Sequence, residues 1–447
     1  ERTAYIGADE LALQAAGLPP RVPGFTYVNS DFGYANDNDV TDTTLFLRRG
    51  RLGAKGEWDV AQIVGTRERR RLVGAFAVQA EDVLNERTFP DTIATGSTDF
   101  DTHGPTVADV CFLSPATDKH VFRLNVPYRA LLPAKTDGLL VCGIAASAHR
   151  DAQPFLRMQA DVQNIGYAAG RAAAMSAATG KPPRAIDVKA LQRHLVEKSV
   201  IPAEALDWTD TLPYPDAALD EAVRTLPNGY QGLNTLLTDT ARAVPRLKAA
   251  FAAATDEEAK FAYAHVLALL GQGDGTSLLI ARLEKAESWD KGWNYKGMSQ
   301  FNRSVSWMDS YVIALGSARA KDAVPVICGL AARLDADGEY SHFRAVSKAL
   351  ESIGDVRGAS VLSTCLRKPG VGGHARTVRT LGPLPALDNN VANRERSLAL
   401  REICLARALY RLGDDADRLG HRTLEAYAAD PRGAFAAHAR LVLSASL

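Results

Sequence analysis

The sequence has few of the features that mark several common protein classes. Its five cysteines are scattered singly without a Cys-x-x-Cys pair, which argues against a zinc site and a disulfide framework. No run of about twenty apolar residues occurs, so we expect no membrane span. The formal net charge of the 447 residues is zero, so the composition does not favour a nucleic-acid partner.

Several sequence motifs that carry chemistry are also missing. The sequence contains no His-Glu-x-x-His, no Gly-x-Ser-x-Gly and no Walker loop. An EF-hand calcium loop starting at Asp37 would need a glycine and an acid where Asp42 and Arg48 stand. The basic run Arg67–Arg71 is short and lacks interleaved aromatics, which favours a solvated strand end over a nucleic-acid site. We therefore predict no catalytic metal and no nucleic-acid partner.

The chain begins with Glu1 and shows no signal peptide. Processing or truncation of a longer product is compatible with this start, and the cellular compartment stays open.

Residues 1 to about 202 mix short apolar runs with turns rich in glycine, proline, aspartate and asparagine. Gly138–Gly143 is a short continuous apolar run, the pattern of a strand buried on both faces. A loop and a helix over Phe155–Ser176 are predicted to follow it. The other expected strands are Gly56–Gly65, Arg70–Gln79 and Lys119–Pro133.

Two glycines lie inside this predicted helix. Gly166 and Gly170 share one helix face, and each costs roughly 1 kcal/mol relative to alanine. A helix face that lacks side chains predicts a close neighbour, which is either a strand of the same sheet or a bound cofactor.

From residue 203 onward the sequence is rich in alanine and leucine and shows a repeat of paired helices. Each pair is predicted to carry a glycine just past the end of its first helix. The pattern resembles HEAT repeats, which bury their apolar faces by stacking into a solenoid. The segment Trp289–Trp307 is an insertion that covers either the other half or its own repeats. The four glycines expected past helix ends are Gly271, Gly316, Gly354 and Gly413.

A set of sequence blocks occurs in one order between Val60 and Leu195. The blocks are RERRRLVGAF (Arg67–Phe76), EDVL (Glu81–Leu84), FPDTIATG (Phe89–Gly96), DFDTHG (Asp99–Gly104), VPYRALLP (Val126–Pro133), DGLLVCG (Asp137–Gly143) and the helix with GYAAG. Together they resemble the C-terminal half of FAD-dependent oxidoreductases of the glutathione-reductase-like fold, a group often found in bacteria.

The resemblance implies an α/β fold in which residues 1–202 complete a two-part FAD-binding domain. Substrate-domain strands of α+β type would extend to about residue 135, and the final strand and helix of the flavin domain would occupy 137–180. Residues 203–447 would form an all-α HEAT-like solenoid. No Gly-x-Gly-x-x-Gly turn follows a predicted strand, so we expect an upstream segment or separate chain to carry it as a partner.

The resemblance also implies which residues contact FAD. The loop from Ile144 to Pro154 would cross the edge of the isoalloxazine ring, and the helix after it would aim its N-terminus at the pyrimidine end. The departures are Ile144, where the family usually has arginine, and Tyr167, where it usually has glutamine. The implied contact residues are Gly143, Ala146, His149, Arg157, Met158 and Gln159, with Gly166 and Gly170 allowing close packing.

His103 is the predicted base that takes a substrate proton, and Asp101 is predicted to orient it. Tyr128 and Arg129 are the next candidates, since an arginine near a flavin binds a carboxylate or steadies the reduced ring. The alternatives are a turn histidine at 103 and a surface salt bridge at Arg129.

The function implied by the resemblance is hydride transfer from a small organic substrate, plausibly a sugar-like alcohol, to FAD. The alternative is a non-enzymatic scaffold in which the helical repeats bind a partner and the flavin fold is degenerate.

Overall fold

The computed structural model describes residues 39–45, 70–98, 109–113, 121–295, 306–377 and 389–445. Contacts divide these residues into two units. The mixed unit comprises the described residues from 70 to 282, and the helical unit comprises those from 283 to 445 together with 39–45. The strand predicted at Gly56–Gly65, and the residues Asp101 and His103, lie outside the described residues. The domain boundary expected near residue 202 stays a prediction.

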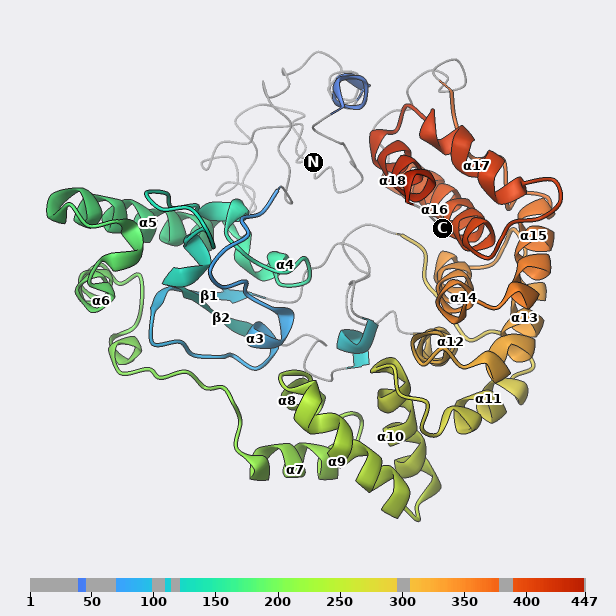
Figure 1. The fold of residues 1–447 in the computed structure, drawn as a ribbon, viewed down its shortest axis with the longest axis horizontal. Helices are drawn as coiled ribbons and strands as arrows, with labels where there is room; N and C mark the ends of the chain where they lie inside the picture. Colours follow the sequence, from blue (N-terminus) through green and yellow to red (C-terminus); the bar gives the residue numbers. More distant parts are fainter. Residues whose placement is uncertain are drawn as a thin grey trace, which may run out of the picture. The chain divides into compact units, whose positions relative to one another are not determined.

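The mixed unit contains a small antiparallel sheet of two strands, with helices around it (Figure 1). The strands are β1 (Thr92–Thr98) and β2 (Phe122–Pro127). The helices are α3 (Ala80–Leu84), α4 (Gln153–Leu156), α5 (Gln159–Thr179), α6 (Val188–Glu197), α7 (Asp216–Thr225), α8 (Leu233–Leu237), α9 (Thr240–Ala253) and α10 (Glu257–Leu269). Short 3-10 turns are η1 (Asp109–Leu113), η3 (Tyr128–Leu131), η4 (Gly143–Ala145), η5 (Pro183–Ala185) and η6 (Ala203–Leu206), and α11 (Thr276–Glu284) spans the boundary between the units.

The strand predictions are met in part. β2 lies inside the predicted Lys119–Pro133, but Arg70–Gln79 forms only two isolated bridges, to Pro133 and Ala148. Residues 138–142 form no strand, in contrast to the expectation. A buried strand needs a neighbour on each edge, whereas the described residues give this run one backbone bond, from Val141 N to Leu131 O at 2.9 Å. Leu139 is 47% exposed.

Helix α5 packs on β1 through a face different from the one that holds its glycines. Ile165 and Ala168 are fully buried toward the core. A Cβ added to Gly166 or Gly170 would meet nothing within 4 Å among the described residues. The close approach falls instead on the strand, because a Cβ on Gly96 would lie 2.6 Å from the Asp161 carboxyl group.

Tyr167, one of the departures from the family pattern, joins α5 to α6. Its hydroxyl group lies 2.8 Å from His194 Nε2, and the two rings stack with centroids 6.0 Å apart. Beyond α6, helices α7 to α10 enclose their own apolar core around Leu219, Leu233 and Leu247. The following aspartates accept backbone N–H bonds as N-caps of α6, α9 and α10, which explains where these helices begin: Asp187, Asp239 and Asp256.

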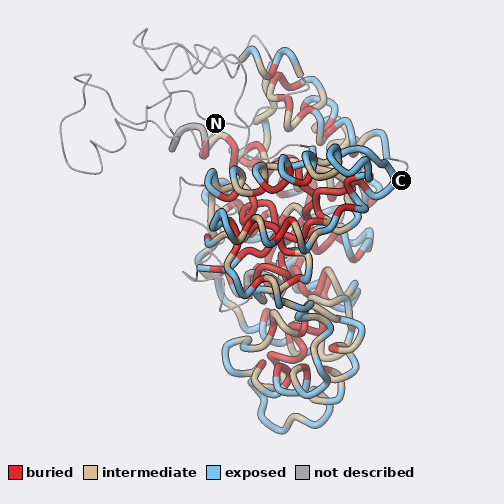
Figure 2. The backbone as a smooth tube through the Cα atoms, turned by 90° about the vertical axis from the view of Figure 1, so that its left-hand side faces the viewer, coloured by how far each residue is buried: buried red, intermediate tan, exposed pale blue. Residues whose placement is uncertain are grey.

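Buried residues gather in the interior of the fold and exposed residues at its periphery (Figure 2). The helical unit is built from helices that pack against one another in pairs. α12 packs against α14 and α14 against α16, while α13 packs against α15. This arrangement is compatible with stacked repeats, and the HEAT-like solenoid stays a prediction. The helices are α12 (Trp307–Ser317), α13 (Val324–Ala332), α14 (Tyr340–Ile353), α15 (Ala359–Arg367), α16 (Asn389–Arg411), α17 (Leu419–Ala428) and α18 (Gly433–Ser444).

Three of the four predicted helix-end glycines have the expected left-handed backbone. Gly271, Gly354 and Gly413 have φ values of 79°, 70° and 101°. Gly316 was predicted wrongly, since it lies inside α12 and the left-handed residue after that helix is Arg319. A Cβ on Gly316 would lie 2.5 Å from Ala349 Cα, so this glycine lets α12 and α14 approach closely.

The described part of the predicted insertion, residues 289–295, packs on its own helices. The Trp289 ring stacks on buried His342 of α14, with centroids 4.3 Å apart. The backbone of Trp293 exchanges bonds with Ser341, accepting from its N–H and donating to its Oγ. The structure therefore favours the alternative in which this segment covers its own repeats.

Candidate functional site

The loop between η4 and α4, predicted to cross a flavin, is held by the segment 72–78. Leu72 N donates to Ala145 O at 2.9 Å, and His149 N donates to Val78 O at 2.8 Å. Gly74 N donates to Ser147 Oγ at 3.1 Å, and a Cβ at position 74 would lie 2.6 Å from Ser147 Cβ. Backbone bonds from a distant segment thus fix this loop, which is what a binding loop needs.

Two of the predicted contact residues in this loop differ in exposure. Ala146 is 1% exposed and belongs to the core, whereas His149 is exposed. His149 Nδ1 accepts a bond from Asp151 N at 3.2 Å, which leaves Nε2 as the donor of the neutral ring. His149 can therefore present an N–H to a ligand. Gly143 begins η4 with φ +68°, and its position lies next to Val162 in the first turn of α5.

The N-terminus of α5 is open. Arg157 is the C-cap of α4, Met158 is the N-cap of α5, and no side chain caps α5. Among the residues that the structure describes, the backbone N–H groups of Gln159, Ala160 and Asp161 have no hydrogen-bond acceptor. Free N–H groups and the helix dipole make such an end a favourable place for negative charge.

Two acids near this loop were not predicted from the sequence. Asp161 is 8% exposed in the first turn of α5, and burial raises the pKa of its carboxyl group. Glu81 of α3 also has a raised pKa, because of its burial and the nearby charges of Asp82 and Asp151, although His149 acts to lower it. An acid in the first turn of a helix is a signal that could have drawn attention to Asp161.

Tyr128 makes its contacts within the fold. Its side chain is buried, its hydroxyl group donates to Pro183 O at 2.7 Å, and burial raises its pKa to about 12. The phenol therefore stays protonated near neutral pH and serves as a hydrogen-bond donor.

Arg129 lies in a network of arginines, acids and aromatic rings. Its guanidinium group is 3.8 Å from Asp91 and 3.6 Å from Asp210, and it lies over the ring of Phe76. Asp210 also makes two 2.8 Å bonds with Arg87. Among the described residues, no hydrogen bond or ion pair joins Tyr128 or Arg129 to the loop and the α5 N-terminus. Their catalytic roles stay predictions.

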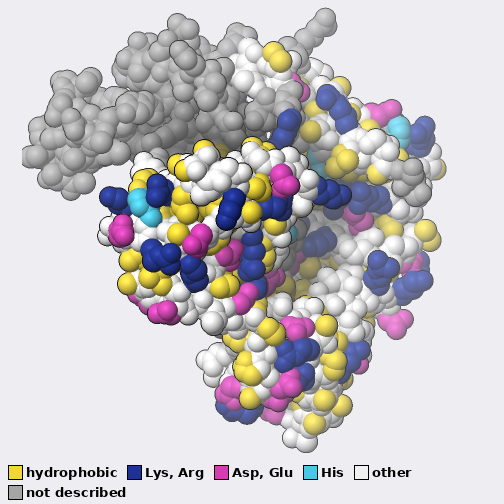
Figure 3. Space-filling view, turned by 60° about the vertical axis from the view of Figure 1, so that its left-hand side comes forward, with side chains coloured by type: hydrophobic (Ala, Val, Ile, Leu, Met, Phe, Trp, Pro, Cys, Tyr) yellow, Lys and Arg dark blue, Asp and Glu magenta, His cyan; other side chains and the backbone are white. Residues whose placement is uncertain are grey.

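The surface is mixed in charge, with Lys and Arg side chains interspersed among Asp and Glu on the face that Figure 3 shows. Within the described ranges, no group of three His, Cys, Asp or Glu side chains is arranged to hold a metal ion. Every helix in the described part of the chain is too short or too polar to cross a membrane.

Comparison with known families supports the resemblance drawn from the sequence blocks. Residues 26–195 match the family model described as FAD dependent oxidoreductase, and the match ends in α6. Proteins of this family use FAD as cofactor, which supports a flavin-dependent oxidoreductase role for the matched region. Comparisons with curated proteins and with solved structures gave no match.

Proposed function

We propose that this chain supplies one part of an FAD-dependent enzyme that oxidises a small organic substrate, plausibly a sugar-like alcohol. The observation that carries the proposal is the family match over residues 26–195, a range that contains the loop from Gly143 and the open N-terminus of α5. When bound, FAD would accept a hydride from the substrate.

The described residues fit the pyrimidine end of a flavin, which becomes negatively charged on reduction. The unpaired N–H groups of Gln159 and Ala160 would face this end. Asp161 stands in the same turn, where burial raises the pKa of its carboxyl group and the carboxyl lies against Gly96 of β1. His149 would donate its Nε2–H to a ring heteroatom.

The proton that leaves the substrate needs a base, and the sequence offers His103 with Asp101 for this task. Tyr128 and Arg129 are proposed in supporting roles, since both already make contacts within the fold. The open glycine face of α5 supports the proposed partner, an upstream segment or chain with the Gly-x-Gly-x-x-Gly turn, because that face is smooth and uncovered among the described residues.

An absorbance spectrum of the protein made from its full-length gene tests the proposal. We expect the two visible bands of oxidised flavin, which a reductant should bleach. A screen of sugars and alcohols for the same bleaching would then identify the substrate, and His103→Gln should abolish bleaching by substrate while leaving the bands. A colourless protein that takes up no added FAD would refute the proposal and favour the scaffold alternative, in which the helical unit binds a partner.

A further inference from the structure

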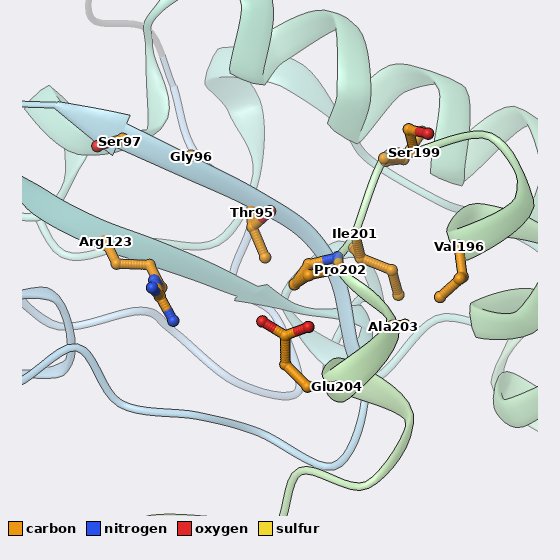
Figure 4. A pocket seen from close by; sticks show the side chains of 11 residues that line it. Thr95, Gly96, Ser97, Arg123, Val196, Ser199, Ile201, Pro202, Ala203 and Glu204 are labelled. Carbon is orange, nitrogen blue, oxygen red and sulfur yellow. The ribbon is translucent and has the colours of Figure 1, made fainter.

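A pocket of about 690 Å³ lies beside the sheet of the mixed unit (Figure 4). One wall is formed by β1 and β2, and the other by the chain from the end of α6 into η6. Its volume lies within the range of about 300–1,000 Å³ that is typical of small-molecule sites.

The pocket lies on the opposite face of the sheet from α5. Ser97 pairs with Arg123 and Thr95 with Asn125, so these side chains share one face of the two strands. Gly96 presents the other face to Asp161 of α5. The pocket is therefore distinct from the α5 N-terminus that we assign to the flavin.

Two opposite charges point into this pocket from its two walls. Figure 4 shows Arg123 extending from β2 and Glu204 extending toward it from η6. Among the described residues, neither charged group makes a hydrogen bond or ion pair; the Arg123 backbone N–H alone donates, to Glu86 Oε1 at 3.2 Å. Arg123 is exposed, and several other arginines of the same unit are paired with acids, as Arg246 is with Asp220. The Arg123 and Glu204 side chains are thus available to a ligand.

The remaining lining combines hydroxyl groups with an apolar wall. Thr95 and Ser97 line the pocket on the strand side, and their hydroxyl groups have no hydrogen-bond partner within the described ranges. Ile201 and Pro202 supply apolar surface beside them. A guanidinium group binds a carboxylate with two parallel bonds, whereas a carboxylate and two hydroxyl groups suit a ligand with several hydroxyl groups of its own.

We propose that this pocket binds a hydroxylated carboxylic acid of the size of a sugar acid. The ligand carboxylate lies on Arg123, and its hydroxyl groups bond to Glu204 and to the serine and threonine hydroxyls. A simple amino acid would satisfy Arg123 and Glu204 but leave the hydroxyl groups of Thr95 and Ser97 without partners. The proposal concerns binding alone and does not depend on the flavin.

Isothermal titration calorimetry of the full chain with D-glucuronate tests this assignment. D-glucose lacks the carboxylate and acetate lacks the hydroxyl groups, so both should bind at least tenfold more weakly than glucuronate. Arg123→Gln should weaken glucuronate binding about tenfold or more, since it removes a charge-assisted pair of bonds. Glu204→Gln should weaken it several-fold, while Arg171→Gln, an exposed position on α5 outside the pocket, should leave it unchanged.

Circular dichroism should show that each variant is folded, and Arg123→Lys, which keeps the charge, should retain part of the affinity. Three results would overturn the proposal. These are no heat of binding with glucuronate, equal binding of glucose, and glucuronate binding that Arg123→Gln and Glu204→Gln leave intact. None of these readouts involves flavin absorbance, so failure here is distinguishable from failure of the proposed oxidoreductase.

Discussion

Replacing glycine by alanine should have opposite effects in two helices of this protein. Gly166 and Gly170 lie in the middle of α5, where a Cβ would meet nothing within 4 Å among the described residues. Alanine at either position should therefore stabilise the helix by about 0.5–1 kcal/mol, because it lowers the backbone entropy of the unfolded chain. Gly316 in α12 has the opposite surroundings, since its Cβ would lie 2.5 Å from Ala349 Cα.

A methyl group at position 316 would destabilise the fold because it would meet backbone atoms of α14, which cannot rotate out of the way as a side chain can. α12 and α14 would have to separate by several tenths of an ångström, and overpacking of this kind costs about 1–3 kcal/mol. The gain in helix propensity of about 1 kcal/mol offsets part of this. The net effect of Gly316→Ala should be destabilising by up to about 2 kcal/mol.

Hydrogen–deuterium exchange measured by mass spectrometry resolves the two units separately. Peptides from α5 should exchange up to about fivefold more slowly in Gly166→Ala and Gly170→Ala, and peptides from α12 and α14 should exchange faster in Gly316→Ala. Faster exchange of α5 in either variant would refute the reasoning, since it would mean that a neighbour already packs on the glycine face. In a flavoprotein that contains the proposed partner segment the expectation reverses, because this segment would meet the new methyl groups and flavin retention should fall.

Three further predictions concern polar groups that make hydrogen bonds within the fold. Burial acts to lower the pKa of His342, but the carboxylate of Asp309, 2.8 Å away, and other nearby acids raise it overall. The stability this provides is fully present below the unfolded-state pKa of about 6.5 and is lost as the pH rises through the folded value. The helical unit should therefore unfold at lower urea concentrations above pH ~6.5, and His342→Gln should flatten this pH dependence. Burial acts to raise the pKa of Asp210, but its bonds with Arg87 lower the pKa overall. The resulting stability is present above an unfolded-state pKa of about 3.9 and is lost as the pH falls through the folded value. The Asp210→Asn variant should therefore unfold at a lower urea concentration at neutral pH, and its stability should depend less on acidification. Tyr128→Phe should cost about 1 kcal/mol through the lost bond to Pro183 O, and unaltered substrate oxidation by this variant would exclude a catalytic role for the phenol.

Local patterns in the sequence predicted the features that depend on neighbours along the chain. The core of β2, the helix that became α5, and the left-handed glycines at 271, 354 and 413 all follow from periodicity and end signals. The resemblance to FAD-dependent oxidoreductases also rested on the order of local blocks, and the family match confirms it in its coarser form.

Features that depend on contacts between distant parts of the chain could not be predicted from the sequence in the same way. A glycine pattern cannot say whether the close neighbour lies on the helix or on the strand, and here the tight contact falls on Gly96, which the Asp161 carboxyl group covers. The same holds for Gly316, whose role depends on an alanine in another helix. The loop predicted to cross the flavin owes its shape to backbone bonds with a segment about seventy residues earlier, such as that from Val78 N to Ser147 O.

The run Gly138–Gly143 shows how these two kinds of information combine. Its composition predicts a strand buried on both faces, yet in the structure it is an irregular segment with Leu139 exposed. Composition reports the surroundings in which a segment is stable, whereas strand geometry requires partner strands that are present. Among the described residues this apolar run has no partner strand, and it leads through Gly143 toward the uncapped N-terminus of α5. We expect both to belong to the surface that the proposed nucleotide-binding segment covers. Adding that segment should slow hydrogen exchange in residues 138–143 and in the first turn of α5 together, and protection of one without the other would contradict a shared binding surface.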